Sequence, residues 1–272
     1  MENTFTIKLH NTALFGQYWK PQIAKAVIVL VHGMGEHSGR YKESVIPFLL
    51  KGNYAVVAYD LFGHGKTKGK RGNCSGYNAL LDSLELAIDK AQTLFNNLPV
   101  FIYGHSLGGN IVINYALKRQ PKIKAIIATS PFLRLAFKLP KWKVALGKLL
   151  FHVFPSITLP SEIDVEAIST IPSQVQQYIQ DPLVHDKISP NYLFPVIEAG
   201  EYAITNAYKL NVPIFITHGT ADRIIDFKGS VAFCKHSKVS DLKLYQDCFH
   251  ELHHDICAQE MIKAIVNWLD KQ

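Results

Sequence analysis

The chain has 272 residues, of which 48% are hydrophobic, and this is enough to build one large core without several domains. No internal repeat, low-complexity tract or Pro/Gly-rich linker divides the sequence, so a single domain over residues 1–272 is expected. The formal net charge of +7 favours contact with anionic surfaces, but no nucleic-acid-binding motif accompanies it, and we expect no nucleic-acid partner.

The first residues lack the basic and apolar regions of a secretory signal, and no later stretch approaches the apolar length of a membrane span. The four cysteines are scattered without a paired framework: Cys74, Cys234, Cys248 and Cys257. We therefore expect a protein of the reducing cytoplasm.

Short apolar runs separated by helical patterns predict the secondary structure. The first two runs, at residues 4–9 and 14–19, predict an antiparallel hairpin. Further strands are predicted at 26–31, 54–59, 100–103, 124–129, 213–217 and 242–245. Because helical crossovers connect parallel strands, the pattern predicts an α/β fold with a mostly parallel central sheet flanked by helices.

The strand at 100–103 runs directly into Gly-His-Ser-Leu-Gly at residues 104–108. Glycines on both sides of Ser106 are typical of a nucleophile elbow, a strained turn that leaves no room for neighbouring side chains. A serine hydroxyl becomes a good nucleophile only when a histidine removes its proton and a carboxylate orients that histidine. Ser106 is therefore the predicted nucleophile, with two partners expected downstream.

Attack on a carbonyl creates an oxyanion, which needs two preorganised backbone N–H donors. The residue after the nucleophile, Leu107, supplies the first donor. The strand at 26–31 ends in a loop where Gly33 and Gly35 let the Met34 amide turn toward the site. Met34 is therefore the second predicted donor.

Residues 130–199 interrupt the sheet and are too many for a structureless loop, which predicts a helical cap inserted into the domain. Residues 132–151 of this insertion hold five basic residues and no acidic one. A basic amphipathic segment suits a membrane surface, although a cap helix with solvated lysines has the same pattern. Pro140 and Gly147 argue against one uninterrupted helix there.

Asp222 follows a predicted strand and a glycine, which makes it the first choice for the carboxylate. Asp226 and Asp247 are the alternatives. His250 follows the last predicted strand and is the predicted general base. The resulting order of serine, aspartate and histidine is the one found in α/β-hydrolases.

The run at residues 250–254 also fits the His-Glu-x-x-His pattern of zinc metalloproteases. That chemistry needs both histidines on one face of a long helix and a third ligand further along, for which only Glu260 is available. The preceding strand favours a loop at His250, with the last helix beginning around Cys257. We therefore expect no metal site.

Six segments together resemble the monoacylglycerol lipase and lysophospholipase branch of the serine α/β-hydrolases. The longest is His-Gly-Met-Gly-Glu-His-Ser-Gly-Arg-Tyr at residues 32–41. The others are residues 60–65, 104–109, 181–183, 218–223 and 250–252. The resemblance implies an α/β-hydrolase fold with a cap, the triad and oxyanion donors named above, and no cofactor.

The resemblance also implies that four residues recognise a glycerol head: Glu36, Arg40, Tyr178 and His253. Two of them have simpler roles available, because Arg40 can pair with Glu36 and His253 can brace its loop.

Ester hydrolysis of a monoacylglycerol is the function implied, with peripheral contact between the basic cap segment and a membrane. A lysophospholipase or general carboxylesterase with the same triad is the first alternative. A non-catalytic lipid- or partner-binding scaffold is the second, because fold alone does not determine function.

Overall fold

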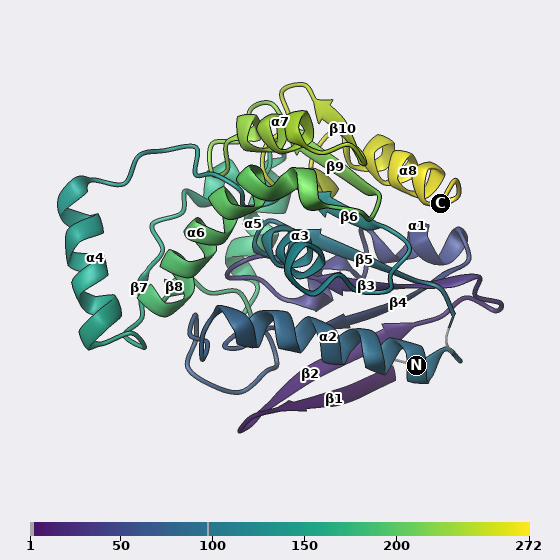
Figure 1. Cartoon of the computed structure of the whole chain (residues 1–272), viewed down its shortest axis with the longest axis horizontal. Coiled ribbons are helices and arrows are strands. Elements are labelled where there is room, and N and C mark those ends of the chain that lie inside the picture. Colours follow the sequence, from purple (N-terminus) through teal and green to yellow (C-terminus); the bar gives the residue numbers. More distant parts are fainter. Residues whose placement is uncertain (1–2, 97) are drawn as a thin grey trace.

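The computed structural model describes residues 3–96 and 98–272, and a single eight-stranded sheet forms its centre (Figure 1). The strands are β1 (Asn3–Leu9), β2 (Thr12–Trp19), β3 (Ala26–Val31), β4 (Tyr54–Tyr59), β5 (Val100–His105), β6 (Ile126–Thr129), β9 (Ile214–Gly219) and β10 (Ser240–Tyr245). They lie in the order β1-β2-β4-β3-β5-β6-β9-β10. β2 is antiparallel to both β1 and β4, and all other neighbours are parallel.

Helices cover both faces of this sheet. One face packs against α2 (Tyr77–Leu94), α3 (Leu107–Arg119), α6 (Pro190–Asn206) and α7 (Phe227–His236). The other packs against α1 (Ile46–Lys51) and α8 (Ala258–Leu269). The central strands are buried along their whole length, which explains their unbroken apolar sequences. The predicted α/β class with a mostly parallel sheet is confirmed.

Residues 130–199 contain the segments that stand away from the sheet. They include α4 (Lys141–Val153), the short paired strands β7 (Leu159–Pro160) and β8 (Lys187–Ile188), and α5 (Pro172–Gln180). Figure 1 shows α4 at the far edge of the molecule. Helix α6 begins inside this segment and continues to Asn206, so residue 199 is not an element boundary.

Helix α4 corrects part of the expectation for the basic segment. It begins directly after Pro140, where a proline is tolerated, but it runs through Gly147 without a break. A Cβ at Gly147 would lie 2.7 Å from the Phe194 ring, so the glycine permits close packing of α4 on α6. The expectation that residues 132–151 do not form one uninterrupted helix is confirmed at Pro140, but the interruption expected at Gly147 is wrong.

Across residues 3–96 and 98–272, no helix has the length and apolar character needed to cross a membrane.

Candidate active site

Ser106 stands at the sharp turn between β5 and α3, with φ 51° and ψ −113°. This left-handed backbone conformation is strained for a residue with a side chain. A Cβ at Gly104 would collide with the carbonyl oxygen of Gly108, and a Cβ at Gly108 would collide with that of Val31. Both glycines are therefore required by the close approach of backbone in the elbow.

The structure brings Ser106, His250 and Asp222 together from the ends of three different strands. Nε2 of His250 lies 2.9 Å from Oγ of Ser106, and Nδ1 lies 2.7 Å from Oδ2 of Asp222. Because the carboxylate can only accept, Nδ1 carries the proton and Nε2 is free to accept the serine hydroxyl proton. The backbone N–H groups of Ile224 and Ile225 donate to Oδ1 of Asp222 at 2.8 and 2.9 Å.

The two alternative carboxylates lie elsewhere. Asp226 caps α7 by accepting a hydrogen bond from the Lys228 N–H at 2.9 Å. Asp247 is on an exposed turn, where its backbone N–H donates to Oγ1 of Thr220. Neither has a hydrogen bond to His250 among the described contacts.

His218 is a partner of Asp222 that the sequence reasoning missed. Its Nε2 lies 3.1 Å from Oδ2 of Asp222, and its Nδ1 lies 2.8 Å from Oγ of Ser230. A donor is needed toward the carboxylate, so Nε2 carries the proton and the Ser230 hydroxyl donates to Nδ1. The signal in the sequence was its place four residues before Asp222 at the end of a buried strand.

The neighbouring charges shift the pKa of His250 upward and the pKa of Asp222 downward. Burial lowers the pKa of His250, but the carboxylates of Asp222, Glu251 and Glu36 together outweigh burial, so the pKa is raised above its usual value. Burial raises the pKa of Asp222, yet His250 and His218 outweigh burial and lower it. Asp222 therefore stays ionised and favours the protonated form of the neighbouring His250.

The two predicted oxyanion donors belong to segments that adjoin Ser106 or its cavity. Leu107 is the first residue of α3, where backbone N–H groups have no intrahelical acceptor. Met34 lines the same cavity as Ser106. Its loop is held by Glu36, whose Oε1 accepts from the Gly33 N–H at 2.6 Å and from the Tyr41 hydroxyl at 2.7 Å.

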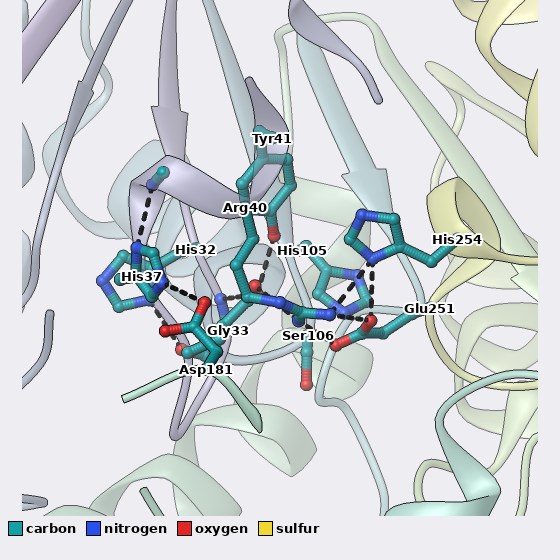
Figure 2. Close-up of polar contacts among 12 residues, drawn as sticks. His32, Gly33, His37, Arg40, Tyr41, His105, Ser106, Asp181, Glu251 and His254 are labelled. Carbon is teal, nitrogen blue, oxygen red and sulfur yellow. Dashed lines mark hydrogen bonds and ion pairs between the residues drawn. The ribbon is translucent and has the colours of Figure 1, made fainter. Parts of the chain in front are cut away.

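Arg40 forms a buried ionic cluster with Glu251, the residue that follows His250 (Figure 2). Its guanidinium donates to both carboxylate oxygens of Glu251 at 2.5 and 2.8 Å, and to Oε2 of Glu36 at 3.2 Å. Burial raises the pKa of Glu251, but Arg40 and His254 together outweigh burial, and the net pKa is well below its usual value. Glu251 immediately follows His250 in the chain, so its ion pair with Arg40 fixes the loop that carries His250.

The four predicted head-group residues divide into two pairs. Glu36 and Tyr178 line the cavity that contains Ser106. Arg40 and His253 line a neighbouring surface groove instead. The His253 ring is buried and stacks on Tyr41 at 4.7 Å between centroids.

The histidine-rich run does not form the long helix of the zinc motif. Only Leu252–His254 is helical, as a 3-10 turn, and His250 precedes it facing the serine. Potential ligand atoms of Glu251, His253 and His254 lie within 4.8 Å of one another, but Glu251 is already paired with Arg40. Glu260 pairs with Lys243 at the surface.

The cavity at the elbow is lined by a few polar and many apolar side chains. The polar ones are Glu36, His105, Ser106, Ser161, Tyr178, His250 and Glu251. The apolar ones are Met34, Phe132, Leu135, Phe137, Leu139, Ile163, Ile168, Ile188, Leu193, Ile224 and Ile225. Most of the apolar residues come from the cap segment, so the cap supplies the surface that an acyl chain would contact.

Comparisons with known proteins give consistent matches. The model of the family described as serine aminopeptidase, S33, matches residues 22–256. The chain is 34% identical to an uncharacterized abhydrolase domain-containing protein of Dictyostelium discoideum over 93% of its own length, but spans only 27% of that larger protein. It is 33% identical to the monoglyceride lipase of Mus musculus, with 94% of this chain and 86% of the relative covered.

Among solved structures, the crystal structure of Paleococcus ferrophilus monoacylglycerol lipase superposes with a TM-score of 0.87 at 35% identity. The match covers 94% of this chain and 98% of the other. The predicted α/β-hydrolase fold is therefore confirmed.

Proposed function

The chain belongs to the serine aminopeptidase S33 family and, within the α/β-hydrolases, to the monoglyceride lipase branch, and on that premise we propose that it hydrolyses monoacylglycerols to glycerol and a fatty acid. It is a serine ester hydrolase. The observation that carries the proposal is the serine–histidine–carboxylate chain, with contacts of 2.9 and 2.7 Å, whose Ser106 and His250 line a mostly apolar cavity. Such a cavity fits a substrate with one acyl chain and a small polar head.

In the proposed mechanism, Ser106 Oγ attacks the ester carbonyl while His250 Nε2 takes its proton. The Leu107 and Met34 N–H groups stabilise the oxyanion. His250 then gives the proton to the departing glycerol oxygen, leaving an acyl-serine. A water whose proton passes to His250 hydrolyses this ester and releases the fatty acid. Asp222 holds the imidazole throughout, and no metal or organic cofactor enters any step.

Glu36 and Tyr178 are proposed to contact the glycerol hydroxyls. Both line the cavity near Ser106, and a carboxylate accepts strongly from hydroxyl donors. Arg40 and His253 act behind them: Arg40 holds Glu36 and Glu251, and His253 braces Tyr41. An anionic head group would face two buried carboxylates here, which favours glycerol esters over phosphate-bearing lysolipids.

We also propose that α4 docks on a membrane surface. No residue of α4 is buried, and Trp142, Leu149 and Phe154 at its end are 64%, 60% and 61% exposed. Lysines at positions 141, 143 and 148 accompany these apolar side chains. Cavity residues Phe137 and Leu139 lie just before α4, so docking would bring the cap side of the cavity to the lipid.

The test compares turnover of matched monoacylglycerol, lysophosphatidylcholine, diacylglycerol and short p-nitrophenyl esters by the protein and by Ser106→Ala. Selective hydrolysis of monoacylglycerol that disappears in the variant is expected, together with fluorophosphonate labelling of Ser106. A preference for lysophospholipid or for short esters would show that monoacylglycerol is not the substrate, while the serine mechanism would still stand. Failure of both turnover and labelling would support the non-catalytic scaffold instead.

A further inference from the structure

A basic loop lies outside the active site, between β4 and α2. Its cations are Lys66, Lys68, Lys70 and Arg71, and the sequence has no acidic residue from position 61 to position 81. The three lysines are exposed. Four cations within six residues form the densest run of charge in the chain, and the proposed hydrolysis uses none of them.

The conformation of this loop is fixed rather than random. Thr67 is buried, donates through Oγ1 to the Asp60 carbonyl at 2.7 Å and accepts there from the Phe15 N–H at 2.9 Å. The Arg71 guanidinium donates to the Gly65 carbonyl at 2.8 Å and closes the loop. Anchoring Thr67 inward keeps the lysines on either side of it in solvent.

The loop borders a surface hollow that contains two of its lysines. Polar side chains and backbone dominate the lining: His10, Asn11, Thr12, Phe62, Gly63, Lys68, Gly69, Lys70, Asn73, Cys74, Ser75, Ser156 and Asn191. None of these residues is acidic. Ammonium groups beside amides and hydroxyls, without a carboxylate, make a favourable environment for a phosphate group.

The hollow lies against the end of α4. Ser156, which lines it, comes two residues after the exposed Phe154, the residue that caps the C-terminus of α4. Asn191 ties the two parts together, because its N–H donates to the Pro155 carbonyl at 3.1 Å and its side-chain amide donates to the Cys74 carbonyl at 2.7 Å. The hollow with the two lysines therefore adjoins the exposed C-terminal end of α4.

We propose that the hollow with Lys68 and Lys70 binds the headgroup phosphates of anionic phospholipids in a membrane on which α4 is docked. This rests on the proposed function in one respect, namely that α4 contacts lipid. The occupant is a membrane rather than a nucleic acid because the adjoining surface presents tryptophan, leucine and phenylalanine side chains, which favour an acyl boundary and add nothing to phosphate-backbone binding.

The test measures binding of the full chain to vesicles of pure phosphatidylcholine and to vesicles containing 30% phosphatidylserine, at about 0.1 M salt. For Lys68→Gln/Lys70→Gln we expect roughly 25-fold weaker binding to the anionic vesicles, since each cation near such a surface contributes about 5-fold. Binding to neutral vesicles should not change. Lys235→Gln/Lys238→Gln on and after α7 removes the same charge from exposed positions elsewhere and is the matched control.

Equal losses in the two double variants would show general electrostatics and overturn the site. No loss in Lys68→Gln/Lys70→Gln would also overturn it, as would an unchanged vesicle affinity combined with weaker binding of a nucleic-acid duplex. Turnover of a short p-nitrophenyl ester separates this result from the proposed function. A loop variant that keeps ester turnover but no longer prefers anionic vesicles supports the headgroup site. Absence of turnover in every variant, including the unaltered chain, would contradict the proposed hydrolysis and leave the headgroup site to the vesicle measurements.

Discussion

Around His250, the side chains of Arg40, Glu251 and Asp222 are almost wholly buried, and each has hydrogen-bonded partners within 3.2 Å. In α4, by contrast, no residue is buried, and large apolar side chains face solvent. A buried charge without its partner is strongly destabilising, so the first region has one stable arrangement. Burying exposed apolar side chains against another apolar surface lowers the free energy, so the second region is suited to binding such a surface.

The largest effect is expected where the first region meets the substrate. Ser106→Ala should lower kcat on the order of 10⁶-fold, because the acyl-enzyme can no longer form. The affinity of the Ser106→Ala variant for vesicles should equal that of the unaltered chain, since α4 is unchanged. Steady-state turnover and vesicle co-sedimentation of the same preparation measure both. If vesicle binding fell with turnover, the two regions would not be independent.

Glu251→Gln tests whether the ionic cluster is as constrained as its burial implies. Removing the charge leaves Arg40 without its bidentate partner, and we expect unfolding free energy to fall by about 3 kcal/mol in urea titrations. The control is Glu162→Gln in the cap, where the ion pair with Lys143 is exposed and a change below about 1 kcal/mol is expected. Similar losses from both variants would contradict the contrast between the two regions.

Trp142→Ser/Leu149→Ser removes apolar area from α4 alone. Binding to neutral vesicles should weaken at least about 10-fold, since burial of even part of these side chains contributes more than 1 kcal/mol. Turnover of a short soluble ester should stay the same. Ile23→Ser/Ile256→Ser is the matched control, because those side chains are 79% and 67% exposed on other surfaces. An equal loss in the control would exclude α4 as the docking surface.

The same contrast explains what could be predicted from the sequence. Buried strands and the glycine-bounded turn at Ser106 leave local patterns, and the fold class and family followed from them. The partnership of Arg40 with Glu251 joins residues 211 positions apart, and no local pattern encodes it. His218 did leave a local signal, four residues before Asp222, but a histidine at a strand end has many possible roles and the signal did not single it out. In α4, the low helix propensity of glycine predicted an interruption at Gly147 that does not occur, because the close approach of α4 to Phe194 outweighs that propensity.

The smallest effect concerns His218, which refines the geometry of the first region without taking part in bond making. His250 must be neutral to accept the Ser106 proton, so kcat/KM should rise with pH through the pKa of His250, which is raised above its usual 6.5. In His218→Leu, Asp222 loses a donor, and its less neutralised carboxylate should stabilise protonated His250 more strongly. The rise should move to higher pH, and kcat should fall roughly 10-fold as the carboxylate loses a fixed orientation. His218→Gln keeps a hydrogen-bond donor and should therefore bring both the pH of the rise and kcat most of the way back to those of the unaltered chain. A merely structural role would lower the amount of folded enzyme while leaving the pH profile where it was.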